Sequence, residues 1–219
     1  MDLSISGMRP IHRFGVLLPG EFRALDDDPV LGGTTLFSTS KARPAMVRLS
    51  RAFNPPGPVD FVGLAVKIPS AYGPGHDQDL IMVSSVAQPV LRRLPFLTIG
   101  PLGTMFTSGT TYAAGPERVV FGAGLEPRPR GQLGPAVCAA VGGGLTIRLM
   151  AASPRGPWRP VATVSVSGEL NDSTDVRFTP SAAGGGLRPV GYVNAFRSIV
   201  YAYFQHGDQD GKKEGTGGD

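Results

Sequence analysis

Apolar and polar residues alternate along much of the chain, and this period of two is typical of β-strands. In residues 44–53 (PAMVRLSRAF) the alternation places Arg48 and Ser50 on one face and Val47 and Leu49 on the other. The same pattern predicts further strands over 12–25, 59–69, 79–86, 145–152, 158–170 and 175–180. Because the face that carries Arg48 and Ser50 is polar, it needs a partner.

One segment, residues 192–206 (YVNAFRSIVYAYFQH), has apolar residues dense enough for a buried helix. Residues 89–106 show no clean period, and we expect a mixture of helix and loop there. The tail over 207–219 is polar and rich in glycine, which predicts disorder. The structured part should therefore be a single domain over residues 1–206.

The glycine and proline content supports a β-rich fold. The 219 residues include 31 glycines and 21 prolines, which disfavours long helices and favours short strands joined by tight turns. Together with the strand pattern, this composition predicts a β-rich (α+β) fold, an antiparallel barrel with few helices and one buried helix near the C-terminus.

Several functional classes are disfavoured by charge and composition. The net charge of +4 does not indicate nucleic-acid binding, because the basic residues are scattered singly and form no stripe. The single cysteine, Cys138, excludes an internal disulfide and a cluster of thiolate metal ligands. No run approaches the roughly 18 apolar residues that span a bilayer, and no secretory leader is evident. We therefore expect a cytoplasmic protein with neither a nucleic-acid nor a membrane partner.

Arg197 and Tyr201 are four residues apart in the predicted C-terminal helix, so they lie on one face of it. The neighbouring residues are apolar, and a buried guanidinium must be paired. A phenolate would pair with it well, but ionising a tyrosine at neutral pH costs roughly 4 kcal/mol. An adjacent cation lowers the pKa of an acid by about 1–3 units, and a metal on the oxygen would supply the remainder. Tyrosinate bound to haem iron is such an arrangement.

At this point the chain resembles the haem catalase family, whose axial tyrosine follows an arginine by four residues. Further motifs of that family occur in order. The segment RPIHRFG supplies Arg9 and His12 at the family's spacing, and VRLS (47–50) is similar to its VRFS stretch through Arg48 and Ser50. A third stretch, residues 59–85, resembles the family at Asp60, Gly63, Ala65, Lys67, Asp79 and Leu80.

The resemblance covers residues 9–86 and 188–206 and implies a catalase-type barrel, with haem b held between the barrel and the C-terminal helix. It implies that Tyr201 is the iron ligand. It also implies that Arg9, Arg48 and Arg197 bind the haem propionates or lie behind the tyrosine, as planar guanidinium groups suit. No motif of the family is found between residues 87 and 187.

The resemblance further implies catalytic roles. His12 would move the protons of a bound peroxide, and Ser50 would orient its ring. The family's distal asparagine falls at Val83 or Ser84, and we take Ser84 as the third catalytic candidate, although serine replaces an asparagine only in part. Losing a preorganised donor typically costs on the order of 10²-fold, so we expect weak catalase activity at most.

The resemblance thus implies a haem enzyme, a peroxidase-like oxidoreductase that reacts with hydrogen peroxide or an organic hydroperoxide and with an unidentified small organic substrate. We expect a monomer or homodimer, because the arm and wrapping segments that interlock full catalases are not evident. Three alternatives are open: a hydroperoxide isomerase or dehydratase of the allene oxide synthase type, a non-catalytic haem-binding or sensing protein, and a haem-free barrel that binds an apolar carboxylate through the same arginines.

Overall fold

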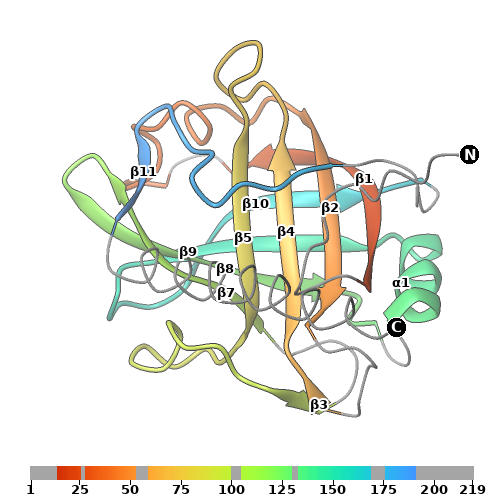
Figure 1. The fold of residues 1–219 in the computed structure, drawn as a ribbon. Coiled ribbons are helices and arrows are strands. Elements are labelled where there is room, and N and C mark those ends of the chain that lie inside the picture. Colours follow the sequence, from red (N-terminus) through yellow and green to blue (C-terminus); the bar gives the residue numbers. More distant parts are fainter. Residues whose placement is uncertain are drawn as a thin grey trace, which may run out of the picture.

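The main feature of the computed structural model is an antiparallel β-barrel (Figure 1). The structure describes residues 14–25, 28–52, 59–99, 105–129, 133–168 and 176–190. Its elements are β1 (Phe14–Ala24), β2 (Arg43–Arg51), β3 (Val59–Asp60), β4 (Val62–Ile68), β5 (Gln78–Ser85), β6 (Thr98–Ile99), β7 (Met105–Ala114), β8 (Glu117–Glu126), α1 (Leu133–Gly142), β9 (Thr146–Ala152), β10 (Arg159–Val166) and β11 (Leu187–Val190).

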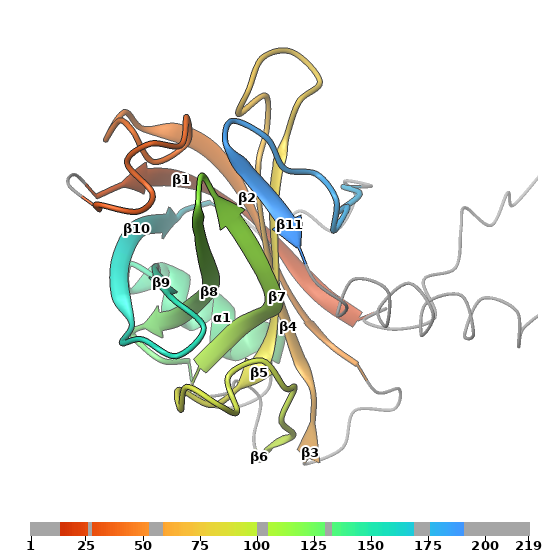
Figure 2. The same ribbon diagram turned by 90° about the vertical axis from the view of Figure 1, so that its left-hand side faces the viewer.

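The barrel closes because β7 pairs with strands on both of its sides. The main sheet has the order β11-β7-β5-β4-β2-β1-β10-β9-β8, and a further pairing of β7 with β8 completes the ring. β5 pairs with the first part of β7 and β11 with its second part. Figure 2 shows β10, β9, β8 and β7 curving around the interior. This arrangement confirms the predicted antiparallel barrel with few helices.

The barrel interior is packed with apolar side chains. The alternate positions of each strand, such as Leu49 in β2 and Leu64 in β4, are fully buried in one core. At one end, Phe37 from the loop after β1 stacks on Phe121 with ring centroids 5.8 Å apart and meets Phe22 edge to face at 5.8 Å. Because side chains fill the interior, a ligand site on the outer face of the barrel is the more natural expectation.

One predicted strand is wrong. Residues 176–181 form no strand but cross the outer face of β4 and β5 as an irregular segment, drawn in blue in Figure 1. The Thr179 amide donates to the Asp79 carboxylate at 2.6 Å, and the Asp79 amide donates to the Ala182 carbonyl at 2.9 Å. The segment is therefore held by a side chain and a single carbonyl and not by the regular backbone hydrogen bonds of a strand pair. Its alternating sequence pattern did not correspond to a strand.

Other elements differ from the expectation or were not foreseen. Residues 89–99 form turns and the short strand β6 instead of a helix, and helix α1 was not predicted. The hairpin of β7 and β8 was also missed. β7 is buried along almost its whole length, including Thr107, Ser108 and Thr110, so it lacks the alternation that marks a half-exposed strand.

The predicted helix over 192–206, the disordered tail and the segment with Arg9 and His12 lie outside the described residues. The domain boundary at residue 206 therefore stays a prediction. Among the helices that can be described, none has the length and apolar character to cross a membrane.

Gly15 provides a test of how closely β1 lies against β2. A Cβ at this position would lie 2.5 Å from the Leu49 carbonyl oxygen and 2.8 Å from the Ser50 Cβ, so the strands would have to separate. We predict that Gly15→Ala lowers the free energy of unfolding by about 1–3 kcal/mol. The measurement is denaturant unfolding followed by circular dichroism.

Gly124 in β8 is the matched control, because no atom lies within 4 Å of its added Cβ. Gly124→Ala should leave stability unchanged or raise it by up to about 1 kcal/mol, since alanine has less backbone freedom to lose. Equal stability of the Gly15→Ala protein and the wild type would contradict the close packing of β1 on β2.

Candidate functional site

The pairing of four strands brings residues from separate sequence motifs into one row. Ser50 of β2 is paired with Gly15 of β1 on one side and with Gly63 of β4 on the other. Gly63 is in turn paired with Val83 of β5. Directly paired residues in an antiparallel sheet point their side chains to the same face. Ser50 therefore lies between two glycines, with Val83 at the end of the row.

A second row lies next to the first on the same face. Arg48 of β2 is paired with Leu17 of β1 and with Ala65 of β4, and Ala65 is paired with Ile81 of β5. All four side chains are half-buried, whereas Leu49, which points to the other face, is fully buried. The two rows therefore lie on the outside of the barrel, on the strands that stand at the front of Figure 1.

We call this surface the outer face and define it by the residues of the two rows, Gly15, Leu17, Arg48, Ser50, Gly63, Ala65, Ile81 and Val83. Three of its residues, Gly15, Gly63 and Ala65, have no side chain or only a methyl group. Its only charged group is Arg48 and its only hydroxyl is that of Ser50, while the remaining side chains are aliphatic. Sequence reasoning found Arg48 and Ser50 but not Leu17 or Ile81, which became visible only once the register was known.

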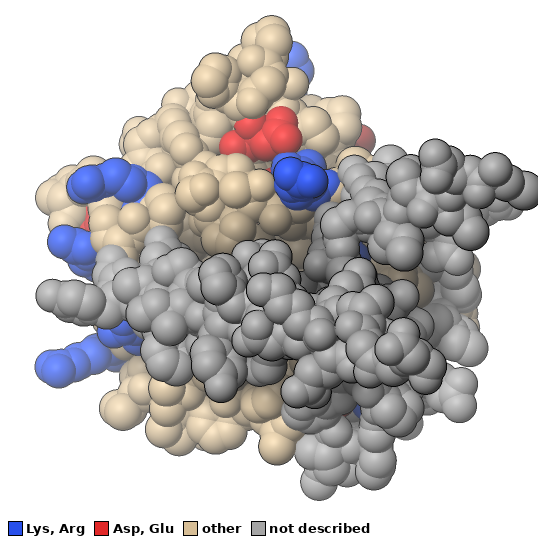
Figure 3. All heavy atoms as spheres, viewed as in Figure 1, with Lys and Arg blue, Asp and Glu red and all other residues tan. Residues whose placement is uncertain are grey.

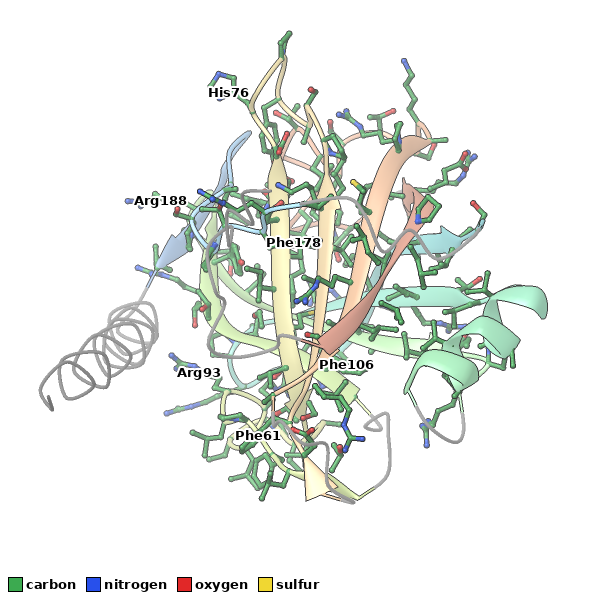
Figure 4. The ribbon with its side chains drawn as sticks, turned by 45° about the vertical axis from the view of Figure 1, so that its right-hand side comes forward. Phe61, His76, Arg93, Phe106, Phe178 and Arg188 are labelled. Carbon is green, nitrogen blue, oxygen red and sulfur yellow. The ribbon has the colours of Figure 1, made fainter. Side chains whose placement is uncertain are left out.

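An ion-pair cluster closes the upper end of the outer face. Lys67 of β4 lies 2.8 Å from Asp79 Oδ1 and 2.9 Å from Asp77 Oδ2, measured from its Nζ. The Phe178 ring lies over the same ammonium, with its centroid at 5.8 Å, and is labelled in Figure 4. Thr179 donates its amide to Asp79. These contacts fasten the irregular segment 176–182 across β4 and β5, and Lys67 and Asp79 had matched the family motif without an assigned role.

The pKa values of this cluster are shifted by burial and by its hydrogen bonds. Burial opposes the charge on Lys67, but the hydrogen bonds to Asp79 and Asp77 outweigh it and hold the pKa of Lys67 above its usual value. The Ser70 amide and Lys67 lower the pKa of Asp77. Burial raises the pKa of Asp79 although Lys67 and the Thr179 amide oppose it. The Asp79 carboxylate therefore depends on the neighbouring cation for its charge.

A second buried carboxylate, Asp60, fastens the lower end. Its Oδ2 lies 2.9 Å from Arg51 Nε, and its Oδ1 accepts the Ala52 amide at 3.2 Å. The Asp60 carbonyl accepts the hydroxyl of Thr98 at 3.1 Å. Asp60 is fully buried and joins the end of β2 to the small sheet of β3 and β6. It thus holds the strands that present Ser50 and Gly63.

Ser84 does not point to the outer face. It follows Val83 in β5, so its side chain projects to the other side of the sheet, where it is fully buried. Its hydroxyl donates to the Phe96 carbonyl at 2.8 Å and accepts the Val62 amide at 3.1 Å. The single hydroxyl proton is thus engaged. The catalytic role of Ser84 stays a prediction, and the side chain that the register places beside Ser50 and Gly63 is that of Val83.

The other predicted site residues lie outside the described part of the chain: Arg9, His12, Arg197 and Tyr201. Of the three predicted site residues that the structure describes, Arg48 and Ser50 lie two residues apart on one strand and on the same face, whereas Ser84 faces the other side of the sheet. In the part of the chain that the structure describes, no three His, Cys, Asp or Glu residues are grouped so as to hold a metal ion. His76 is exposed in the loop between β4 and β5, at the far upper end in Figure 4.

The outer face fits one side of a flat, largely apolar group that carries a carboxylate. Its glycines and alanine carry the smallest side chains, and the aliphatic side chains of Leu17, Ile81 and Val83 on the same face could contact a planar ring system. A guanidinium binds a carboxylate through two parallel hydrogen bonds, which suits Arg48 at the margin. Haem has this combination of a flat apolar ring and carboxylates. Its iron would need a ligand from beyond the described residues.

Comparisons with known proteins agree with the fold. The chain is similar in structure to catalase A from Saccharomyces cerevisiae, with a TM-score of 0.65 and 13% sequence identity over 90% of this chain. It is also similar to a bacterial catalase, with a TM-score of 0.58 and 12% identity over 92% of this chain. No protein-family model matches the sequence, and no curated protein matches it.

These likenesses establish a catalase-like fold and no more, because the sequence identities are low. The chain spans less than two thirds of the length of either catalase, since the matches cover 60% and 59% of those chains. Activity has to be argued from the residues.

We predict that Lys67→Met destabilises the protein by about 3–5 kcal/mol, because it leaves Asp79 buried without a cation. Asp79 would then have a still higher pKa. An acid whose pKa is higher in the folded protein than in the unfolded chain contributes fully to folding stability at pH values below its unfolded pKa. This contribution is lost as the pH rises through its folded pKa. The loss should therefore be larger at neutral pH than at pH near 4. Denaturant unfolding at the two pH values measures it.

Arg148→Met is the matched control, because Arg148 forms an exposed pair with Glu126 at 2.9 Å. Exposed pairs contribute about 0–1 kcal/mol, so this variant should remain close to the wild type at both pH values. A Lys67→Met protein as stable as the Arg148→Met protein at neutral pH would show that the cluster does not hold segment 176–182 in place.

Proposed function

We propose that this chain binds haem b against the outer face and reacts with a peroxide. One observation carries the proposal. Two separate stretches of the sequence resemble the family, VRLS (47–50) and, within residues 59–85, GLAVK (63–67). Strand pairing sets Ser50 beside Gly63 and Arg48 beside Ala65. The catalase-like fold supports the same conclusion, since two catalases are among the proteins to which the chain is structurally similar.

In this proposal the C-terminal segment supplies the iron ligand, Tyr201. Arg197, four residues earlier in the predicted helix, favours the ionised phenol by its positive charge. Arg48, together with Arg9, binds the propionates, while the aliphatic side chains of the outer face exclude water from one side of the ring. When bound, the haem supplies a redox-active iron that can cleave the O–O bond of a peroxide.

The proton transfers belong to His12. It accepts the proton of the peroxide as a general base and returns it to the departing oxygen as a general acid. Ser50 accepts a hydrogen bond from the second ring nitrogen of His12, which fixes the tautomer in which the first nitrogen is free to accept a proton. The neighbours of Ser50 on either side in its row are glycines, which place no side chain beside its hydroxyl.

The oxidised substrate in this proposal is organic. The register places Val83 at the end of the row that holds Ser50, and a valine offers no hydrogen bond to a second molecule of hydrogen peroxide. Ile81 and Leu17 add aliphatic surface on the same face. An organic hydroperoxide, or an organic reductant acting after hydrogen peroxide, therefore suits this surface better than dismutation of hydrogen peroxide.

The ligand assignment is tested by Tyr201→Phe. The purified wild-type protein should show a haem absorption band, whereas Tyr201→Phe should lose the cofactor or bind it far more weakly, because the phenolate oxygen is absent. Tyr203→Phe is the matched control and should keep the spectrum of the wild type. The measurement is the absorption spectrum of each protein after expression with ample haem precursor.

Two results would overturn the ligand assignment or the cofactor. A Tyr201→Phe protein with unchanged colour would show that another residue binds the iron. A wild-type protein that is colourless under these conditions, and that stays colourless when haem is added, would favour a haem-free barrel that binds an apolar carboxylate.

The proton-transfer role is tested by His12→Ala. This variant should retain the haem absorption band, but its rate of peroxide consumption should fall by about 10²–10⁴-fold, because it lacks the positioned acid–base group. His76→Ala, which removes an exposed histidine from a distant loop, should have the wild-type rate. A haem-bound wild-type protein that consumes neither hydrogen peroxide nor cumene hydroperoxide would instead indicate a non-catalytic haem protein.

A further inference from the structure

Large exposed apolar side chains gather in one loop of the described structure. Of the five such residues, four belong to the connection between β5 and β6: Val90 is 82% exposed, Leu91 40%, Leu94 53% and Leu97 51%. The fifth, Leu25, follows β1. Scattered single residues of this kind are ordinary on protein surfaces, but a cluster within eight residues marks an interaction site more often than chance.

The loop is held rigidly by a buried arginine. Arg92 is only 1% exposed, and its guanidinium donates to the Gly156 carbonyl at 2.8 Å and to the Ser153 carbonyl at 3.5 Å. The same guanidinium lies over the Trp158 ring, 4.4 Å from the ring centroid. Trp158 in turn donates its ring N–H to the Ala87 carbonyl at 2.9 Å. The loop between β9 and β10 is thus joined to the loop between β5 and β6.

Hydroxyl groups fix the backbone of the same loop from the barrel side. Ser85 donates to the Leu94 carbonyl at 2.7 Å, Ser84 donates to the Phe96 carbonyl, and Thr107 donates to the Arg92 carbonyl. With its carbonyl groups bound to the barrel, the loop cannot turn its leucines inward. The exposed side chains are therefore presented to the surroundings by a fixed scaffold.

We define the docking end as residues 86–97 together with residues 153–158. Figures 1 and 2 agree that these two loops lie side by side at the lower end of the barrel, opposite the long loop between β4 and β5. The second loop adds the exposed Arg155 and the half-buried Trp158. The first adds Arg93, which is labelled at the same end in Figure 4.

The charged residues within the docking end all have one sign. The sequence has no Asp or Glu between Asp79 and Glu117, and none between Glu126 and Glu169. The docking end falls within these two stretches, so its charged residues are arginines alone. In Figure 3, no acidic side chain is visible at the lower end among the described atoms, whereas the largest acidic patch on this side lies near the upper end.

We propose that the docking end binds the surface of a lipid bilayer that contains anionic lipids. Leucine and valine side chains would enter the acyl boundary, and Trp158 has the amphipathic ring that favours the interface. Arg93 and Arg155 would lie at the level of the headgroups, where each basic residue adds electrostatic attraction to anionic lipid. The sequence predicts no membrane partner, because it lacks an apolar run long enough to span a bilayer. The exposure of these side chains depends instead on how Arg92 anchors the loop.

A second copy of the chain fits this end less well. A stable protein interface uses roughly 20–30 residues a side, and the two loops of the docking end together are shorter than that. Their shape is also that of two projecting loops (Figures 1 and 2), which suits insertion into a soft surface. A patch of basic and apolar side chains, without carboxylates, finds no opposite charge in a copy of itself across a twofold axis.

Vesicle flotation tests the proposal. The full chain should float with vesicles of phosphatidylcholine and phosphatidylglycerol, and less with phosphatidylcholine alone or at high salt. The double variant Val90→Asn/Leu94→Asn should bind about tenfold or more weakly, because two inserted side chains are lost. Leu25→Asn, an exposed leucine outside the docking end, should bind as the wild type does.

The contribution of basic side chains to vesicle binding is tested by a matched pair of arginine variants. Arg155→Gln should weaken binding to vesicles with phosphatidylglycerol severalfold and leave the weak binding to phosphatidylcholine unchanged. Arg188→Gln, which removes an exposed arginine from β11, should change neither. Equal effects of Arg155→Gln and Arg188→Gln would overturn the assignment of the headgroup contact to the docking end.

Trp158 allows a measurement on the unaltered protein, because it is the single tryptophan of the chain. Its fluorescence should be quenched by vesicles that contain brominated phosphatidylcholine and phosphatidylglycerol, but not by the unbrominated vesicles. Wild-type protein that remains unbound to every vesicle overturns the proposal. The proposal is also overturned if the wild-type protein sediments as a dimer and the Val90→Asn/Leu94→Asn protein as a monomer, because a second copy of the chain would then cover the docking end. Neither measurement requires haem or peroxide, so the outcome is independent of the proposed function.

Discussion

The register of β1, β2, β4 and β5 is the constraint on which the site depends. Leu49 and Leu64 face the core and are fully buried, while Arg48 and Ser50 lie on the opposite side of the same strands. Because side chains alternate along a strand, a slip of one residue would turn Arg48 into the core and Leu49 out to solvent. The burial of the core positions therefore also fixes which residues form the outer face. The chemistry of that face is a consequence of how the core packs.

The cluster of Lys67, Asp77 and Asp79 fixes the path of segment 176–182 across the barrel. A buried ion pair contributes little net stability compared with apolar side chains of the same size, because both charges lose their hydration. It does, however, require its partners at fixed positions, and the Thr179 amide and the Phe178 ring meet that requirement. The cluster thus determines where the chain crosses the barrel after β10. Apolar packing alone would leave the path of that segment less defined.

The sequence allowed the strands around the VRLS and GLAVK segments to be predicted, because one face of each is buried and the other is not, which produces a period of two. The same rule failed for β7, whose two faces are both buried, and for residues 176–180, where no neighbouring strand exists. It also left Val83 and Ser84 undecided. An alignment places the family's asparagine only to within one residue, and adjacent residues of a strand point to opposite faces of the sheet. The pairing of Val83 with Gly63 shows that Val83, and not Ser84, points to the outer face. The roles of the terminal residues rest on the resemblance alone.

Arg92 and Arg93 show a further limit of sequence reasoning. Arg92 also explains how the two ends of β5 differ. The two arginines are adjacent and would both be read as surface residues, yet Arg92 is buried and binds carbonyl groups across the barrel while Arg93 is half-buried. Burying an arginine without a carboxylate is costly. Arg92 offsets part of this cost through its hydrogen bond of 2.8 Å to Gly156, the longer contact of 3.5 Å to Ser153 and its position over the Trp158 ring. At the upper end of β5, buried charge fixes a covering segment; at the lower end, it fixes a loop that presents apolar side chains outward. β5 thus connects the end of the barrel that segment 176–182 covers to the docking end, which we propose contacts a lipid bilayer.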